Sequence, residues 1–321
     1  MITSIGSYLS LEFNPISSYI YYKDSQYINT GRNAFEYILK SKDVRKVFIP
    51  YLCCDALLSP LIKNHIEYEY YYVDINHRPI WDFRKLGEKE YFLYINYYGL
   101  RDIVIQELSE KIDNLIIDNT QAFFSKPYQK LPTFYSTRKF FGVADGALLC
   151  NVENLIELEQ DKSADRMKHL LLRVENPSEV GHKAYQENEE LLDTMPLMLM
   201  SELTKKILLS VNFEHHKAAR NNNFNFLNKS LNKYNKFKIN EINGPLAYPL
   251  WVNNGPEIRK ALKDNRVFTP IFWNSVLDNL PKDSIEYDIV INTIPIPIDC
   301  RYSQDDLQMV FDIVNPFLNG N

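Results

Sequence analysis

The feature that most constrains the fold is an alternation of short apolar runs with helical patterns in the first half of the chain. The runs lie at 47–49, 68–74, 91–96 and 115–117, and a helical pattern at Val104–Ile112 separates the last two. Strands that alternate with helices favour a parallel sheet covered by helices on both faces. Ligands of such sheets bind beyond the carboxyl ends of the strands. We therefore expect an α/β fold with a binding site at that edge.

The length of the chain leaves room for a second unit. With 321 residues it can form one large domain and a smaller one. We expect a large α/β domain over 24–210 and a small α+β domain over 211–321, with 1–23 packing on the small domain. The patterns of the small domain predict strands at 247–252, 267–270 and 289–293, and helices at 256–263 and 304–314.

Other segments give weaker local patterns. The aromatic run 19–22 is compatible with a strand or a sheet edge, and a short helix is expected at 155–158. Residues 174–190 contain proline, glycine and several acids, so we expect a loop there. Helical patterns at 201–211 and 214–231 should connect the two domains.

Composition and charge exclude several classes of protein. A hydrophobic content of 45% indicates a globular chain, and a net charge of −5 argues against a general nucleic-acid binder. No apolar run approaches the length of a membrane span, and the N-terminus lacks a signal-peptide pattern. The cysteines form no CxxC pair and have no zinc spacing, which indicates reduced thiols and no metal site. We expect a soluble, cytoplasmic protein.

An acid and a lysine follow neighbouring strand patterns. Asp118 ends the apolar run that begins at Leu115, and Lys139 lies shortly before the glycines Gly142 and Gly146 and the strand pattern 147–150. Alone, such an acid is often only a helix cap, and such a lysine is usually a solvated side chain. Together they suit pyridoxal phosphate (PLP), which needs a carboxylate at its ring nitrogen and a lysine at its aldehyde.

A third element of this pattern precedes them in the chain. Thr30 can cap the helix whose apolar face includes Ala34 and Leu39, and Gly31 permits close approach of a ligand to the backbone. A helix N-terminus attracts anions through its free N–H groups and its dipole. This feature alone is weak, because most capped helices bind nothing.

In this order, the three elements resemble the nucleotide-sugar aminotransferases of the DegT/StrS type. Those enzymes are fold-type I PLP-dependent transferases with a mostly parallel sheet sandwiched by helices and a smaller C-terminal α+β domain. The matching residues are Asp118 with Gln121, Ser136 with Lys139, and the Gly142/Gly146 turn.

The resemblance implies a role for each matching residue. Lys139 would be the catalytic lysine that binds the cofactor, Asp118 would contact the ring nitrogen, and Gln121 would lie near the ring oxygen or orient Asp118. Cys54 occupies the position of the family's ring-stacking aromatic residue, with Tyr51 as an alternative. The phosphate would be bound by Thr30, Gly31, Arg32 and Ser136. The family's usual phosphate-binding serine is replaced here by Phe134.

The resemblance also implies a reaction and a partner. The enzyme would move an amino group from an amino acid, glutamate being the expected donor, to a nucleotide-linked keto-sugar for surface polysaccharide or lipopolysaccharide synthesis. It would act as a homodimer with shared active sites, and Arg166 would face the partner's site. Relatives that dehydrate sugars carry histidine in place of the lysine, so Lys139 favours transamination.

Three alternatives remain at this point. The chain could be a PLP-dependent sugar dehydratase, or a cofactor-free homologue that acts as a binding partner. An ordinary nucleotide-binding α/β domain is the least favoured, because no GxGxxG follows the first strand pattern.

Overall fold

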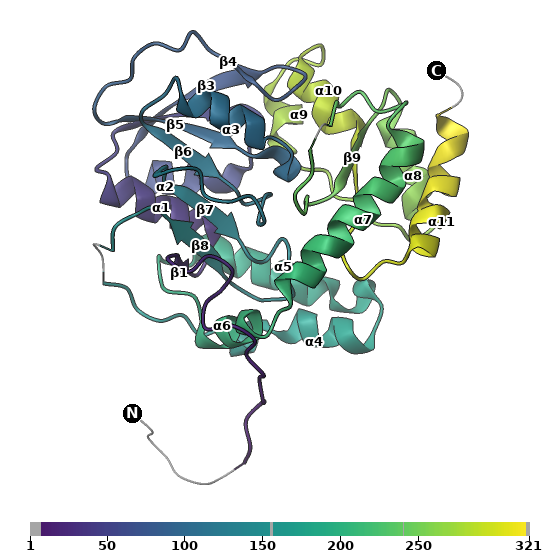
Figure 1. The fold of residues 1–321 in the computed structure, drawn as a ribbon, viewed down its shortest axis with the longest axis horizontal. Coiled ribbons are helices and arrows are strands. Elements are labelled where there is room, and N and C mark those ends of the chain that lie inside the picture. Colours follow the sequence, from purple (N-terminus) through teal and green to yellow (C-terminus); the bar gives the residue numbers. More distant parts are fainter. Residues whose placement is uncertain (1–7, 155–156, 240, 319–321) are drawn as a thin grey trace.

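An eight-stranded sheet forms the centre of the larger part of the molecule (Figure 1). The computed structural model describes residues 8–154, 157–239 and 241–318. In chain order the strands of this sheet are β1 (Gln26–Ile28), β2 (Lys46–Pro50), β3 (Glu67–Val73), β4 (Pro79–Ile80), β5 (Glu90–Ile95), β6 (Leu115–Asp118), β7 (Thr133–Ser136) and β8 (Ala147–Cys150). Their spatial order is β1-β8-β7-β6-β5-β2-β3-β4.

The five central strands β7, β6, β5, β2 and β3 run parallel to one another. The pairs β3–β4, β7–β8 and β1–β8 are antiparallel. Since β1 and β7 are both antiparallel to β8, they run parallel to each other. The end of β1 therefore lies at the same edge of the sheet as the ends of β6 and β7. The predicted mostly parallel α/β sheet is confirmed.

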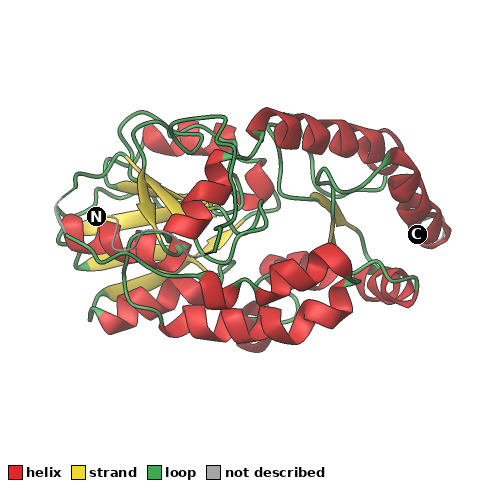
Figure 2. Ribbon diagram, turned by 90° about the horizontal axis from the view of Figure 1, so that it is seen from below, coloured by secondary structure: helices red, strands yellow, loops and turns green. Residues whose placement is uncertain are grey.

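Helices cover both faces of this sheet (Figure 2). They include α1 (Gly31–Ser41), which packs against β7 and β8, α2 (Leu58–Lys63), and α3 (Asp102–Ser109), which packs against β6. Short 3₁₀ helices lie at Asp55–Leu57, Tyr97–Gly99, Ala164–Arg166 and Asn315–Phe317.

The C-terminal region contains a second, two-stranded sheet with helices around it. It follows α6 (Glu202–Leu209), whose Leu208 packs in one cluster with Phe123 and Leu148 of the larger part. Its elements are α7 (Phe213–Leu231), β9 (Tyr248–Trp251), α8 (Gly255–Asp264), α9 (Ser275–Asn279), α10 (Ile285–Asn292), β10 (Thr293–Ile296) and α11 (Gln304–Val314). The strands β9 and β10 pair antiparallel. The predicted helices α6, α7, α8 and α11 are confirmed, and Ser303 caps α11 through a capping box with Asp306.

Two strand predictions in this region were wrong. Residues 267–270 belong to no strand, and residues 289–292 form the last turn of α10. The β-branched run misled the prediction, because a short apolar run does not separate a strand from a buried helix. The start of α10 is fixed by a cap at Ser284, whose hydroxyl accepts a hydrogen bond from the Tyr287 N–H at 3.3 Å.

The loop predicted at 174–190 was also wrong. Most of it lies in α5 (Ser178–Thr194), which packs against α4 (Lys168–Glu175). Gly181 marks the close approach of the two helices, because a Cβ there would lie 3.1 Å from the His169 carbonyl oxygen.

Two further local predictions also differ from the structure. Residues 19–22 form bends rather than a strand. Of the helix expected at 155–158, residues 155–156 lie outside the described residues and 157–158 are not helical.

An aromatic cluster packs beneath the segment that carries Lys139. Phe123 makes an edge-on contact with Phe141, with ring centroids 4.8 Å apart, and Phe123 and Phe140 lie 5.7 Å apart. These rings are buried and belong to a hydrophobic cluster that also contains Phe124 and Tyr135. Because buried rings pack in restricted arrangements, this cluster fixes the path of the chain on both sides of Lys139.

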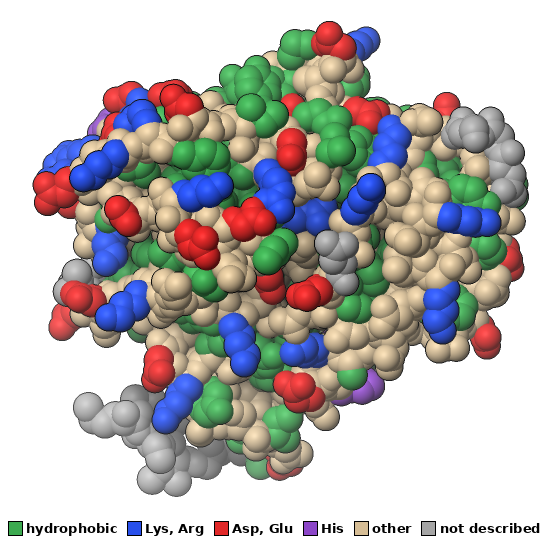
Figure 3. Space-filling view, turned by 45° about the horizontal axis from the view of Figure 1, so that its top comes forward, with side chains coloured by type: hydrophobic (Ala, Val, Ile, Leu, Met, Phe, Trp, Pro, Cys, Tyr) green, Lys and Arg blue, Asp and Glu red, His purple; other side chains and the backbone are tan. Residues whose placement is uncertain are grey.

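The surface carries charges of both signs. On the face seen in Figure 3, acidic and basic side chains are interspersed among the described residues rather than gathered in one stripe. Within the described part of the chain, no helix is long and apolar enough to cross a membrane.

Candidate active site

The ends of β1, β6 and β7 meet around a cavity of about 240 Å³. Because these strands end at one edge of the sheet, the residues that follow them are brought together there. The cavity is lined by Thr30, Gly31, Arg32, Cys54, Ala56, Leu57, Asp118, Thr120, Phe134, Ser136, Arg138, Lys139, Glu189, Leu192 and Asp193. Every predicted site residue except Gln121 is among them.

The N-terminus of α1 forms one wall of this cavity. The Thr30 hydroxyl accepts a hydrogen bond from the Asn33 N–H at 3.1 Å, so the predicted helix cap is confirmed. A Cβ at Gly31 would lie 3.3 Å from Cγ2 of Thr120, closer than most such contacts. Glycine therefore keeps the first turn of α1 open toward the cavity, where its free N–H groups can meet an anion.

Asp118 supplies a buried carboxylate to the cavity. Its side chain is 4% exposed, and Oδ1 accepts a hydrogen bond from the Thr120 N–H at 2.8 Å. Burial raises the pKa of the Asp118 carboxyl, while the charge of Lys139 and hydrogen bonds from Thr120 oppose that shift. A positively charged group beside Asp118 would therefore be stabilised by it.

Lys139 lies on the same cavity, and Thr120 connects it with Asp118. The Lys139 Nζ donates a hydrogen bond to the Thr120 hydroxyl at 3.2 Å, and the lysine side chain is exposed. The sequence analysis missed Thr120. Its position directly after the strand-ending acid was the available signal.

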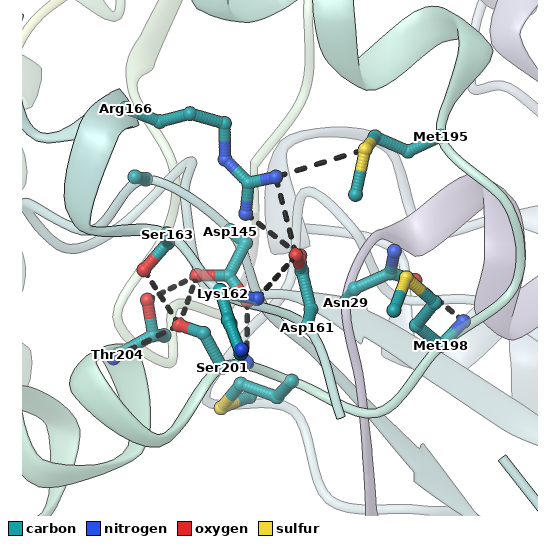
Figure 4. A network of polar contacts seen from close by, with 12 residues as sticks. Asn29, Asp145, Asp161, Lys162, Ser163, Arg166, Met195, Met198, Ser201 and Thr204 are labelled. Atoms are coloured by element: carbon teal, nitrogen blue, oxygen red, sulfur yellow. Dashed lines mark hydrogen bonds and ion pairs between the residues drawn. The ribbon is translucent and has the colours of Figure 1, made fainter. Parts of the chain in front are cut away.

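The turn after Lys139 is fixed by a glycine and a buried acid. Gly146 has φ of +117°, and a Cβ there would lie 2.4 Å from the Thr137 hydroxyl, so only glycine fits. The fully buried Asp145 accepts hydrogen bonds from the Ser201 N–H and hydroxyl, both at 2.7 Å, and from the Thr204 hydroxyl (Figure 4). These bonds tie the turn to the start of α6.

Arg166 lies in the same region and is buried (Figure 4). It forms an ion pair with Asp161 at 2.7 Å, and its Nη1 also reaches the Met195 sulfur. The structure thus gives Arg166 partners within its own chain, and its expected role at a partner's site stays a prediction.

Two arginines at the cavity are paired with acids from α5. Arg32 contacts Asp193 at 2.6 Å, and Arg138 forms an ion pair with Glu189. Arg32 also donates to the carbonyl oxygen of Leu192 at 3.0 Å. The sequence analysis missed Glu189 and Asp193 because it placed most of this helix in a loop. The signal was their spacing of four residues, which puts both on one helix face.

The remaining predicted residues have mixed outcomes. Ser136, Cys54 and Phe134 all line the cavity. Gln121 lies elsewhere, where its Oε1 accepts a hydrogen bond from the Tyr98 N–H at 2.9 Å. Tyr51, the alternative to Cys54, stacks on Tyr70 with ring centroids 4.5 Å apart and is not a lining residue.

No known family model matches this sequence, and no curated protein matches it. Solved structures do match its fold. The sugar aminotransferase CalS13 from Micromonospora echinospora is 14% identical with a TM-score of 0.62, covering 91% of this chain and 87% of that one. A DegT DnrJ EryC1 StrS aminotransferase from Brucella abortus is 13% identical with a TM-score of 0.62, covering 92% and 86%.

A third match is a structure in its PLP-form. The PLP-form of Spr1654 from Streptococcus pneumoniae is 13% identical with a TM-score of 0.61, covering 94% of this chain and 88% of that one. At these identities the similarity shows the fold alone. The chain therefore has the fold of the sugar aminotransferases of the DegT/StrS type, the fold type I of PLP-dependent enzymes, as the sequence analysis expected.

Among the described residues, no group of three or more histidine, cysteine, aspartate or glutamate side chains could hold a metal ion. The four cysteines are free; Cys53 and Cys150 are buried, Cys54 is exposed and Cys300 is half-buried.

Proposed function

We propose that this protein is a PLP-dependent aminotransferase that moves an amino group from an amino acid, glutamate in our proposal, to a nucleotide-linked keto-sugar. The observation that carries this proposal is that Asp118 and Lys139 line one cavity together with the N-terminus of α1. A carboxylate, an amine and an anion site are the three groups that PLP needs from a protein.

The residues present fit the cofactor. Burial raises the pKa of the Asp118 carboxyl, and the charge of a protonated ring nitrogen beside it, like that of Lys139, would lower that pKa and keep the carboxylate ionised to hold the ring. The open first turn of α1 at Gly31, with Thr30, Arg32 and Ser136, would hold the phosphate. Cys54 and Phe134 would lie against the ring. When bound, PLP supplies an electron sink for the carbon that loses a proton during transamination.

The residues of the chain would perform the proton transfer. Lys139 is exposed to the cavity, and its amine would bind the aldehyde in the resting enzyme and carry the proton once substrate has replaced it. The Thr120 hydroxyl, which accepts a hydrogen bond from Nζ of Lys139, would keep that amine above Asp118.

Our proposal extends to the setting of the enzyme. We propose a cytoplasmic homodimer that acts in surface polysaccharide or lipopolysaccharide synthesis, with a large domain over 24–210 and a small domain over 211–321. The resemblance to the DegT/StrS type supports these assignments.

One observation favours a second function. Arg32, expected at the phosphate, and Arg138, which lines the same cavity, are paired with Asp193 and Glu189. Carboxylates at these positions compete with phosphate, as expected for a cofactor-free homologue that acts as a binding partner.

A half-reaction separates the two functions. Purified protein loaded with PLP is mixed with glutamate, and the absorbance of the bound cofactor and the release of 2-oxoglutarate are followed. The enzyme should convert the cofactor band and release one equivalent of 2-oxoglutarate per site. Lys139→Ala should do neither, while the exposed Lys126→Ala should behave like the wild type. Wild-type protein that takes up no PLP would support the binding partner instead.

A further inference from the structure

Two acids of α5 neutralise the arginines that line the cavity of the candidate active site. Asp193 contacts Nη2 of Arg32 at 2.6 Å, and Glu189 forms an ion pair with Arg138. The two acids lie four residues apart, on one face of α5, and all four side chains line the cavity. Both arginines of the described lining are therefore already paired with a carboxylate of the same chain.

The charges of this described lining balance one another. Three cations face three acids there: Arg32, Arg138 and Lys139 on one side, and Asp118, Glu189 and Asp193 on the other. A phosphate group brings a charge of about −1.5 to −2 near pH 7, so adding it to this set would leave the cavity strongly negative. The two carboxylates of α5 together carry about the same charge as that phosphate.

Arg32 is held in place by contacts that do not involve Asp193. Nη1 donates a hydrogen bond to the carbonyl oxygen of Leu192 at 3.0 Å, and Nε donates one to that of Ala56 at 3.3 Å. Its Nη2 contacts the carboxylate. The Arg32 side chain is 15% exposed, whereas that of Asp193 is 65% exposed. The carboxylate can therefore turn into solvent and leave Nη2 to another anion, while the guanidinium keeps its position.

Arg138 has an unused donor beside its own acid. Its Nη2 contacts Glu189, whereas its Nε is buried and has no hydrogen-bond partner among the described residues. A buried donor without an acceptor is costly, above all on a charged group. A phosphate has several acceptor oxygens, so it can accept hydrogen bonds from Nε and Nη2 together. Exchange of Glu189 for phosphate would thus satisfy a donor that the carboxylate leaves unused.

The end of α5 is fixed beside α1, so the exchange of partners has to occur in the side chains. The amide group of Asn33, in α1, donates to the carbonyl oxygens of Met195 and Pro196 at 3.2 and 2.8 Å. The amide group of Asn29 donates to the Pro196 carbonyl oxygen at 3.0 Å. Both asparagines are buried. These bonds keep the acids of α5 within reach of the two arginines, with or without an anion between them.

We propose that Asp193 and Glu189 are a built-in substitute for phosphate. They neutralise Arg32 and Arg138 when no phosphate is bound, and a phosphate group has to displace them in order to bind. This competition lowers the affinity of the cavity for phosphate and makes its release easier. The assignment of that phosphate to PLP rests on the proposed function, whereas the displacement itself can be measured with inorganic phosphate.

Equilibrium dialysis of the full chain, freed of any cofactor, tests this inference with inorganic phosphate, PLP and pyridoxal. Asp193→Asn should bind inorganic phosphate and PLP about tenfold more tightly than the wild type, because a competing ion pair and a repulsion are both lost. Glu189→Gln should act in the same direction. Pyridoxal lacks the phosphate and should bind to all variants equally. Glu190→Gln, at an exposed position of α5 outside the lining, should stay within about twofold of wild type. Phosphate binding that is unchanged or weaker in both acid variants would overturn the inference, as would an equal gain for pyridoxal.

A double-mutant cycle tests whether the gain depends on the released arginine. Arg32→Gln should weaken phosphate binding. Adding Asp193→Asn to Arg32→Gln should then tighten it less than about threefold, because no cation is released. The same gain with and without Arg32 would contradict displacement. Thermal unfolding of each variant shows that the differences in binding do not come from differences in folding.

Transamination assays beside the binding measurements separate this inference from the proposed function. If Asp193→Asn binds phosphate more tightly and the wild type loaded with PLP performs no transamination, the displacement stands and the proposed reaction fails. If the wild type performs transamination and its phosphate affinity is independent of both acids, the reaction stands and the displacement fails.

Discussion

The substitution Asp145→Asn tests how the turn that carries Lys139 is held. In the protein, Oδ1 of Asp145 accepts hydrogen bonds from the hydroxyls of Ser201 and Thr204, and Oδ2 accepts one from the Ser201 N–H at 2.7 Å. Asparagine keeps one acceptor oxygen, and the hydroxyls can rotate to use it. Its NH₂ group would face the fixed Ser201 N–H, so one charge-assisted hydrogen bond is lost and a buried donor is left without an acceptor. We expect a cost of about 3 kcal/mol in the free energy of unfolding.

Thermal unfolding converts this cost into a measurable shift. With an unfolding entropy of about 2.1 cal/mol/K per residue, the Tm of a chain of 321 residues shifts by about 1.5 °C for each kcal/mol of unfolding free energy. Asp145→Asn should therefore lower Tm by about 4–5 °C. The control Asp165→Asn, at an exposed position, should stay within about 1 °C. If both variants unfold at the wild-type temperature, the buried network does not hold this turn and our reasoning is refuted.

Two other predictions concern stability. In Gly181→Val the new side chain would press against the His169 carbonyl, which should lower the free energy of unfolding by about 1–3 kcal/mol. Val180→Ala, at an exposed position, should change that free energy little. Equal melting temperatures of the two variants would contradict the close packing. Burial raises the pKa of Glu36, but hydrogen bonds from Lys40 and Lys63 outweigh it and lower that pKa overall. A lowered carboxyl pKa stabilises the fold above the unfolded pKa of about 4.3 and loses that contribution as the pH falls through the folded value. Glu36→Gln should therefore be less stable at pH 7 and lose less stability between about pH 5 and pH 3; parallel stability curves would exclude this role.

The sequence predicts much of the sheet because its strands are continuous apolar runs between helical patterns. The runs at 68–74 and 115–117 became β3 and β6, and the acid after the second lies at the cavity. The helix cap at Thr30 and the capping box at Ser303 can also be predicted from the sequence, because both depend on neighbouring residues only.

What the sequence could not predict depends on contacts between distant segments. Gly181 looks like a loop signal until α4 is seen to pack against it. Glu189 and Asp193 reach the cavity only because α5 lies across the ends of the sheet strands, a placement that no local pattern contains. Arg220 looked like part of a polar helix run, but it is buried against Phe140 from the turn after Lys139.

The most direct test of our account is to locate the cofactor on the chain. Protein incubated with PLP is reduced with borohydride and digested, and its peptides are weighed and sequenced by mass spectrometry. Our account predicts one phosphopyridoxyl group, on Lys139, and weaker retention of PLP before reduction in Asp118→Asn. A label on another lysine, or retention unaffected by the loss of the Asp118 charge, would contradict it.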